Sequence, residues 1–240
     1  MGMTWRHLLS KLPVIFVLGM ASHGRLWQPV IDRLSDVVEP TIARCSGESL
    51  ADFADEILAD APARFAIAGI SMGGYVALEV ALRGDTRLAG LVLLNTNARP
   101  ASELQVQRST ALLEDAKRGL FETVADKLAE IVAGGKADVA PLAASMARTL
   151  GCDGYLRQQR AVLARRDRRS ELRQIAVPTL VIAGDEDRIS APSLANEIAR
   201  SVPGAELEIF PCGHLSTVEV PEMVSASLRD WLSRRVEGGA

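Results

Sequence analysis

The 240-residue sequence predicts an α/β fold with about six mainly parallel strands flanked by helices. The first observation is that short, continuous apolar runs alternate with amphipathic stretches, which is typical of a parallel sheet covered on both faces. The second is that this alternation stops after Pro100 and resumes only near Pro178. A helical insertion between two strands of one large core explains both observations.

The predicted strands are short apolar runs, most of which end in glycine or in a polar cluster. The run over residues 37–43 is weaker and contains Pro40, which has no backbone N–H and therefore favours an edge strand. The strands are expected over residues 13–19, 37–43, 65–68, 91–94, 178–184 and 207–210.

The segments between these runs carry the spacing of amphipathic helices. Leu50, Phe53 and Ile57 recur at helical intervals after Ser49, whose side chain is suited to cap a helix. Pro221 likewise suits the first turn of the last helix. The core helices are expected over residues 24–34, 49–59, 75–82, 192–201 and 221–234.

The insertion is predicted to contain helices and no strand. They are expected over residues 102–118, 121–133, 140–150 and 155–164, separated by glycine-containing stretches. An insertion at this point lies most simply above the C-terminal edge of the sheet, as a lid. We therefore divide the chain into a core, residues 1–100 and 175–240, and a helical cap, residues 101–174. The cap connects the fourth predicted strand to the fifth. The Leu, Ala and Met content of the cap favours a small, largely apolar substrate.

The N-terminal region allows two interpretations. Arg6, His7 and Lys11 precede an apolar run over residues 12–21, as in a secretory signal. We favour a buried strand, because cleavage there would delete a segment that the chemistry below requires. No apolar run is long enough to cross a membrane, so we expect no membrane partner.

Composition restricts the partners and the compartment. A net charge of −3 argues against nucleic acid as a general partner. Cys45, Cys152 and Cys212 are odd in number and show neither a disulfide framework nor metal-ligand spacing, which favours a reducing cytoplasm. Basic residues gather over 157–173, where we expect a solvated helix face; the alternative is an arginine that meets a substrate carboxylate.

The stretch Gly69-Ile70-Ser71-Met72-Gly73-Gly74 joins a predicted buried strand to a predicted helix. Glycines remove side chains that would collide in so sharp a turn, and they tolerate unusual backbone angles. Ser71 would then stand exposed above the sheet, and the Met72 amide at the helix N-terminus could bind a developing oxyanion. The alternatives are an ordinary glycine-rich turn or a phosphate cradle.

A nucleophilic serine needs a base and an acid that orients the base, in the order serine, acid, histidine on this type of fold. His214 is the only histidine after Ser71, and it follows the last predicted strand directly. The loop after residues 182–184 offers three acids, between which spacing does not choose: Asp185, Glu186 and Asp187.

A second oxyanion donor is expected in the loop after the first strand, beside the serine strand. The Gly19-Met20 junction supplies a backbone amide there, and Gly19 allows close approach. His23-Gly24 is a rival position, but it lies beyond the strand end, so we favour Met20.

Together these motifs resemble the α/β-hydrolase superfamily, in its small lidded esterase and lactonase branch. The matching stretches span most of the chain apart from the helical insertion and are residues 18–20, 69–74, 178–187 and 212–216. The resemblance implies that Asp187 is the acid, through the G-x-x-D pattern, and that the oxyanion amides belong to Met20 and Met72. Leu18-Gly19 replaces the usual His-Gly, which puts the shape of the oxyanion loop in doubt. Two N-terminal strands that many members carry are expected to be missing.

The resemblance implies a serine hydrolase that cleaves a carboxylic ester or lactone through an acyl-enzyme, with Ser71, Asp187 and His214 catalytic. This chemistry requires no metal and no organic cofactor. The stretch 213–222 and Leu94-Asn95-Thr96 also look like enol-lactone hydrolases. Alternatives on the same residues are a carbon–carbon bond hydrolase, which Leu215 disfavours, a cofactor-free haloperoxidase, acyl transfer to another acceptor, and a ligand receptor without turnover.

Overall fold

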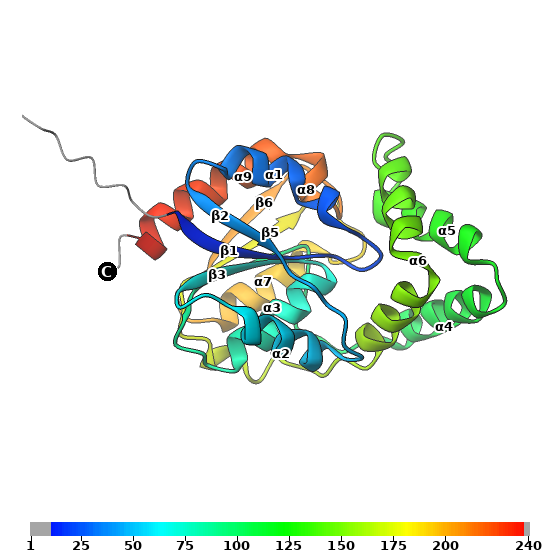
Figure 1. Cartoon of the computed structure of the whole chain (residues 1–240), viewed down its shortest axis with the longest axis horizontal. Helices are drawn as coiled ribbons and strands as arrows, with labels where there is room; N and C mark the ends of the chain where they lie inside the picture. The colour runs from blue at the N-terminus through cyan, green and yellow to red at the C-terminus, as the bar shows by residue number, and fades with distance from the viewer. Residues whose placement is uncertain (1–10, 238–240) are drawn as a thin grey trace, which may run out of the picture.

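A computed structural model describes residues 11–237 of the chain, and within these residues it contains one six-stranded parallel sheet (Figure 1). The order of the strands across the sheet is β2-β1-β3-β4-β5-β6. The strands are β1 (Leu12–Val17), β2 (Val38–Ile42), β3 (Phe65–Ile70), β4 (Leu88–Leu94), β5 (Thr179–Gly184) and β6 (Glu206–Phe210). The predicted α/β fold with about six parallel strands is therefore confirmed.

The order of strands reverses between β1 and β3, which pair directly although β2 lies between them in the sequence. At such a switch point, neighbouring loops leave in opposite directions and open a crevice beyond the carboxyl ends of the strands. The loop after β1 and the turn after β3 flank this crevice. These segments contain Met20 and Ser71.

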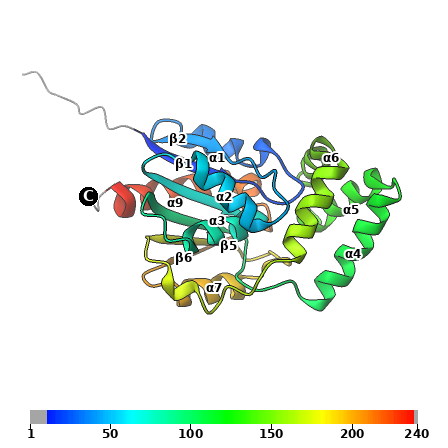
Figure 2. The same ribbon diagram turned by 60° about the horizontal axis from the view of Figure 1, so that its bottom comes forward.

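Helices cover both faces of the sheet (Figures 1 and 2). One layer comprises α1 (Gln28–Leu34), α8 (Ser216–Glu219) and α9 (Pro221–Trp231). The other comprises α2 (Leu50–Asp60), α3 (Met72–Leu82) and α7 (Pro192–Ser201). Alternate residues of each central strand enter the two buried clusters, as Val92 and Leu94 do on one face and Leu91 and Leu93 on the other.

The edge position of β2 agrees with the prediction from Pro40. β2 pairs with β1 alone, so the missing N–H of Pro40 costs no bond within the sheet. The predicted cap at Ser49 is also present: its side chain accepts a hydrogen bond from the Asp52 amide, and Asp52 accepts one from the Ser49 amide in return.

Several boundaries differ from the sequence-based expectations. The first helix is preceded by a separate 3₁₀ turn, Gly24–Leu26, which the side chain of His23 caps. The two helices expected over 140–164 form one helix, α6 (Ala140–Leu163), with a kink at Gly151, where φ is 79° and ψ is 169°. Glycine adopts this backbone conformation without a steric penalty. The last helix passes into a π-helix over Leu232–Glu237, and the short α8 was not predicted.

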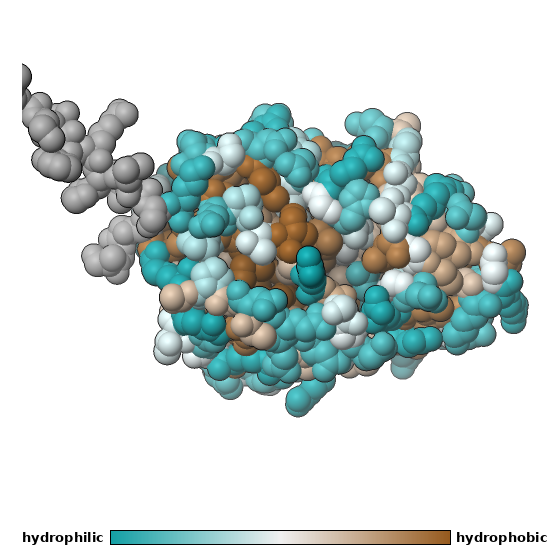
Figure 3. Space-filling view, viewed as in Figure 1, coloured by the Kyte–Doolittle hydropathy of each residue, from teal (hydrophilic) through white to brown (hydrophobic). Residues whose placement is uncertain are grey.

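Three helices follow β4 and stand beyond one end of the sheet (Figures 1 and 2). They are α4 (Glu103–Lys117), α5 (Phe121–Ala133) and α6. They pack around their own apolar cluster, which includes Leu113, Val124 and Tyr155. Figure 3 shows hydrophobic residues at the surface of this end of the molecule as well as over the sheet. We call residues 101–174 the helical segment from here on.

The expectations for Arg6 and His7 lie outside the described residues. Between residues 11 and 237, none of the helices has both the length and the apolar character that spanning a bilayer requires.

A buried ion pair fixes the point at which the chain returns from the helical segment to the core. Arg168 donates two hydrogen bonds to the carboxylate of Glu79 on α3, of 2.7 and 2.6 Å, and its amide donates to Ala98 O. The side chains are 16% and 10% exposed. A partner removed from such a pair leaves an uncompensated charge in a poorly solvated place.

We therefore predict that Arg168→Met lowers the free energy of unfolding by about 3 kcal/mol, because Glu79 loses its bidentate partner. Urea denaturation followed by circular dichroism measures this change. The matched control is Arg169→Met, which breaks an exposed pair with Asp167 and should cost less than about 1 kcal/mol. Equal losses in the two variants would contradict the argument.

Candidate active site

Ser71 occupies a strained turn between β3 and α3. Its φ of 56° and ψ of −116° are unusual for a residue with a side chain. The turn is held by hydrogen bonds: the Ser71 amide donates to Leu94 O at 2.9 Å, and the Ser71 carbonyl accepts from the Gly74 amide and from the Thr96 hydroxyl. The strain is thus opposed by contacts to the neighbouring strand β4.

The glycines of this turn are required by close approach. A Cβ at position 69 would lie 2.1 Å from the Gly73 carbonyl oxygen, and one at position 73 would lie 2.3 Å from the Val17 carbonyl oxygen. Both separations are impossible for real atoms. The elbow interpretation of residues 69–74 thus agrees with the packing.

A chain of hydrogen bonds links the three side chains singled out in the sequence. His214 Nε2 lies 2.9 Å from Ser71 Oγ, and His214 Nδ1 lies 2.8 Å from Asp187 Oδ2. His214 and Asp187 are buried. Of the three acids in the loop after β5, Asp187 alone meets the imidazole, while Asp185 and Glu186 are exposed.

The Asp187 carboxylate is fully used as an acceptor. Oδ1 accepts from the amides of Ile189 and Ser190 at 2.8 and 2.9 Å, and Oδ2 accepts from Asn95 Nδ2 at 3.1 Å in addition to His214. Burial raises the pKa of Asp187, but the hydrogen bond and charge of His214 and these donors outweigh burial, so the pKa lies below its ordinary value. The group remains an anion that can orient the imidazole.

Asn95 was not recognised as a site residue in the sequence. It follows β4, is fully buried and has a φ of 46°. Its Nδ2 donates to Asp187 and also to Gly213 O at 3.1 Å, and its Oδ1 accepts from Ser216 Oγ at 2.6 Å. One side-chain amide therefore joins the loop of residues 185–191, which we call the acid loop, to the loop of residues 211–215, which we call the histidine loop. A polar residue at the carboxyl end of a central strand was the available signal.

Glu219 was also missed. It lies on α8 and folds back so that its carboxylate accepts from the amides of Gly213 and Leu215, at 2.6 and 2.9 Å. These two amides flank His214. The short helix α8 makes this possible, and no periodicity in the sequence indicated such a helix.

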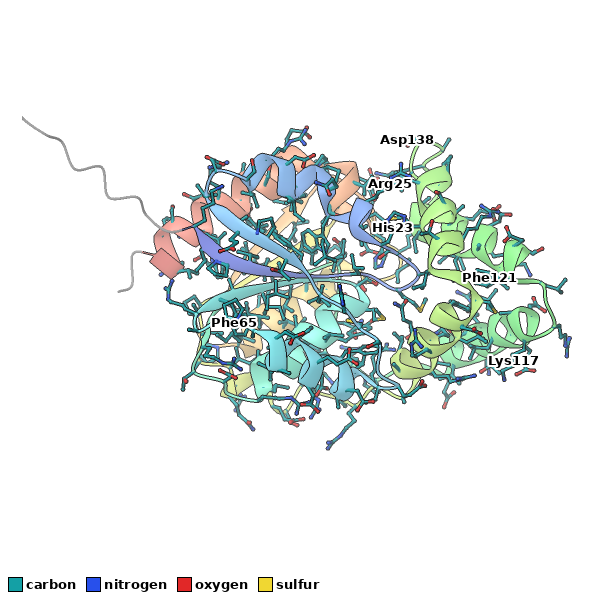
Figure 4. The ribbon with its side chains drawn as sticks, in the orientation of Figure 1. His23, Arg25, Phe65, Lys117, Phe121 and Asp138 are labelled. Carbon is teal, nitrogen blue, oxygen red and sulfur yellow. The ribbon has the colours of Figure 1, made fainter. Side chains whose placement is uncertain are left out.

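The loop after β1 approaches Ser71 closely. A Cβ added to Gly19 would be 3.7 Å from Ser71 Cβ, in ordinary contact, so the backbone of residues 19–20 lies beside the serine. Ala21 has a φ of 54°, and its amide donates to Oε1 of the buried Gln158 on α6 at 2.9 Å. His23 was the rival position for the second oxyanion donor. Its side chain accepts a hydrogen bond from the Arg25 amide. Both residues lie on the side of the core that faces the helical segment (Figure 4).

A cavity of about 390 Å³ opens above Ser71, between the sheet edge and the helical segment. Met20, Ser71, Met72 and His214 line its floor. Apolar side chains from α5 and α6, including Leu128, Val132 and Met146, line one side. Its volume is in the range of small-molecule sites.

The cavity lining also has a polar part, which carries positive charge. Arg108 from α4 and Arg188 from the acid loop line it, and no Asp or Glu is among the lining residues in the described part of the chain. Neither arginine has an ion-pair partner within residues 11–237.

The basic run 157–173 does not form the single solvated face that we expected. Arg168 is paired with Glu79, and Arg165 is buried with its guanidinium 4.5 Å from the ring centroid of Tyr75, a cavity residue. Arg165 donates to the carbonyls of Arg99 and Val162 and to Gln105 Oε1. The chain leaves α6 at Leu163, so the later arginines follow a turn and meet different neighbours. None of the run's arginines lines the cavity within the described residues.

The strand order and the turn carrying Ser71 define an α/β hydrolase. The model of the alpha/beta hydrolase family matches residues 13–226, and the chain belongs to this family.

Curated relatives agree with this assignment. The chain is 28% identical over 231 residues to a pimeloyl-[acyl-carrier protein] methyl ester esterase of Nitrosomonas europaea, covering 87% of this chain and 91% of the relative. It is 27% identical over 240 residues to 3-oxoadipate enol-lactonase 1 of Acinetobacter baylyi, covering 87% and 84%. The malate-bound thermophilic esterase of Thermogutta terrifontis superposes with a TM-score of 0.84 at 26% identity, over 93% of this chain and 90% of that one. The predicted superfamily resemblance is confirmed.

The lowered pKa of Asp187 gives a pH-dependent prediction. A carboxyl whose pKa is lower in the folded state stabilises the fold above its unfolded pKa of about 4, and this contribution is lost as pH falls through the folded pKa. Asp187→Asn should therefore destabilise the fold more near pH 7 than near pH 3.5. Urea titrations at both values measure this. Asp185→Asn, in the same loop but exposed, is the control, and an Asp187→Asn cost independent of pH would refute the argument.

Proposed function

We propose that the protein is a serine hydrolase that cleaves a carboxylic ester or lactone of a small, largely apolar substrate through an acyl-enzyme. The observation that carries the proposal is the hydrogen-bonded chain from Asp187 through His214 to Ser71, which ends at the floor of the cavity. The names of the relatives, an esterase and an enol-lactonase, support ester and lactone substrates.

In the first half of the reaction, Ser71 Oγ attacks the substrate carbonyl while His214 Nε2 accepts its proton. The Asp187 carboxylate accepts a hydrogen bond from Nδ1–H, which fixes the tautomer, and stabilises the imidazolium that forms. His214 then donates its proton to the departing alkoxide. In the second half, a water deprotonated by His214 attacks the acyl-enzyme and releases Ser71.

The tetrahedral intermediate carries an oxyanion, for which we propose the amides of Met20 and Met72 as donors. Met72 begins α3, so its amide points from the positive end of a helix, and Met20 lies in the loop beside Ser71. The bond from Ala21 to Gln158 supports this role, because it fixes the chain one residue beyond Met20.

We further propose that the helical segment, residues 101–174, acts as a cap that selects the substrate. It contributes the apolar side of the cavity and the arginine of α4. The reaction as written uses no metal and no organic cofactor. The three cysteines are free, and Cys212 is buried, which fits our proposal of a cytoplasmic enzyme.

Replacing the nucleophile tests the proposal. Ser71→Ala should reduce hydrolysis of short-chain p-nitrophenyl esters by at least about 10³-fold, because no acyl-enzyme forms. A fluorophosphonate probe should label the parent and not this variant, as intact-protein mass spectrometry will show. Ser35→Ala, a change of an exposed serine on the α1 side of the sheet, is the control. Full esterase activity in Ser71→Ala would refute the proposal, and ligand binding by the parent without turnover would favour a receptor.

The charge of the polar part of the cavity lining predicts a substrate preference. A methyl ester that ends in a free carboxylate should show a kcat/KM about fivefold above that of its neutral analogue of equal length, because Arg108 and Arg188 attract the anion. The preference should fall as salt is added.

The double variant Arg108→Met/Arg188→Met should abolish this preference while the neutral ester is still hydrolysed. Arg118→Met removes an exposed arginine of the helical segment outside the cavity and is the control. Equal kcat/KM values for the charged and neutral esters in the parent would contradict the predicted role of the two arginines.

A further inference from the structure

A single lysine of the helical segment contacts Glu186, in the loop that carries Asp187, and Glu219, which supports the loop that carries His214. Lys136 lies in the connection between α5 and α6, and its Nζ is 2.8 Å from Glu219 Oε2 and 2.7 Å from Glu186 Oε2. Glu186 precedes Asp187 in the acid loop. Glu219 holds the two amides that flank His214. The ammonium therefore lies where the helical segment, the acid loop and the histidine loop meet.

The backbone before Lys136 is shaped for this reach. Gly134 and Gly135 have φ values of 60° and 94°, which glycine tolerates, and they end α5. The Lys136 amide then donates to Ala133 O at 3.0 Å, and its carbonyl accepts from the Val139 amide. The side chain is thus directed from a defined turn, and is 31% exposed.

The negative charge of the Glu219 carboxylate is compensated by the Lys136 ammonium. The Glu219 side chain is only 4% exposed, and within residues 11–237 Lys136 is the one cation at ion-pair distance. The hydrogen bonds to Glu186 and Glu219 raise the pKa of Lys136, so the ammonium stays charged at neutral pH.

The other titratable groups around Glu219 do not replace Lys136. Cys212 lies in the histidine loop, where burial and the Glu219 charge raise the pKa of its thiol to about 12. Asp185, Glu186 and Asp187 in the acid loop add negative charge. The helices α1 and α9 pack against α8, and they carry charged side chains in exposed ion pairs, such as Arg33 with Glu222 and Arg229 with Asp36, while His214 is engaged with Asp187.

We propose that Lys136 is a positioning residue: through its ion pair with Glu219, it holds the loop of His214 in its reactive arrangement, and this arrangement therefore depends on the position of the helical segment. The inference rests on the proposed serine hydrolase function. Lys136 does not line the cavity, so its effect falls on the reactivity of His214 rather than on substrate binding.

The contacts of the Glu219 carboxylate provide the signature of this role. Its oxygens accept from the amides of Gly213 and Leu215, and Oε2 also pairs with Lys136. Without the ammonium, nothing from the helical segment holds the carboxylate against these two amides, so the loop of His214 is less firmly placed. The cavity lining itself is left intact.

The test compares Lys136→Met, Lys136→Arg and Glu219→Gln. Lys136→Met should lower kcat for p-nitrophenyl butyrate about tenfold, with KM changed less than about twofold, because His214 is less well positioned. Lys136→Arg, which restores a cation, should recover most of the activity. Glu219→Gln should also have a lower kcat, and adding Lys136→Met to it should lower kcat by less than about twofold more, because the ion pair is already broken.

Lys127→Met is the matched control. It removes an exposed lysine of the same helical segment, paired with Asp115 3.2 Å away and remote from both loops, and should behave as the parent does. Circular dichroism establishes that each variant is folded. If Lys136→Met keeps the kcat of the parent, or if Lys127→Met shows the same loss, the proposal is wrong.

A measurement independent of turnover separates this inference from the proposed function. Hydrogen exchange of the Gly213 and Leu215 amides, followed by mass spectrometry of the 211–220 peptide, should be faster in Lys136→Met and near the parent rate in Lys136→Arg. Should the parent hydrolyse no ester, the proposed function fails, while unchanged exchange in Lys136→Met would overturn the positioning role by itself.

Discussion

The strained turn at Ser71 is the constraint on which the site depends. A side chain at a φ of 56° and a ψ of −116° costs on the order of 1–3 kcal/mol, so the surrounding structure has to impose it. Two devices do so. The bonds to Leu94 O and Thr96 Oγ1 tie the turn to the neighbouring strand, and the absence of side chains at Gly69 and Gly73 lets α3 start directly against β1 and β3. The strain raises the hydroxyl above the sheet edge, within reach of His214.

The rest of the site is assembled by loops that leave neighbouring strands. The turn after β3, Asn95 after β4, the acid loop after β5 and the histidine loop after β6 follow one another along the same edge. Because the central strands β3, β4 and β5 are parallel and largely buried, their ends are fixed by the core rather than by the loops. Groups remote in sequence can then be held within hydrogen-bonding distance, as Asn95 Nδ2 and the Gly213 carbonyl are.

Much of this arrangement could be predicted from local patterns, and the exceptions have a common physical cause. Apolar runs and glycine punctuation predicted the six strands, and the position of His214 after the last of them predicted its place beside Ser71. Asp187 could be chosen from the three loop acids only by resemblance, since the choice depends on which way each side chain points. Asn95 and Gln158 act through side-chain hydrogen bonds between segments far apart in the chain. Glu219 acts through bonds to the amides four and six residues before it. The sequence has no periodic signal for either kind of contact.

The helical segment also has features that local sequence patterns did not predict. The bounds of its helices were predicted closely. The sequence did not reveal that the last two form one helix, α6, which changes direction at Gly151, where φ is 79°. The expected solvated face over 157–173 agrees with the exposure of Arg160, Arg166, Arg169 and Arg173 but not with the place of Arg165 and Arg168. These two find partners in the core, which helical spacing does not reveal. Charge at the cavity comes instead from Arg108 and Arg188, isolated in the sequence and brought together by the fold.

The central claim, that Ser71 is the nucleophile of an acyl-transfer reaction, is tested most directly by trapping the intermediate. The parent protein is mixed briefly with a p-nitrophenyl ester, quenched in acid, digested with pepsin and analysed by tandem mass spectrometry. We expect the acyl group on Ser71 during turnover. Steady hydrolysis with Ser71 unmodified, or with the acyl group on another residue, would contradict the claim.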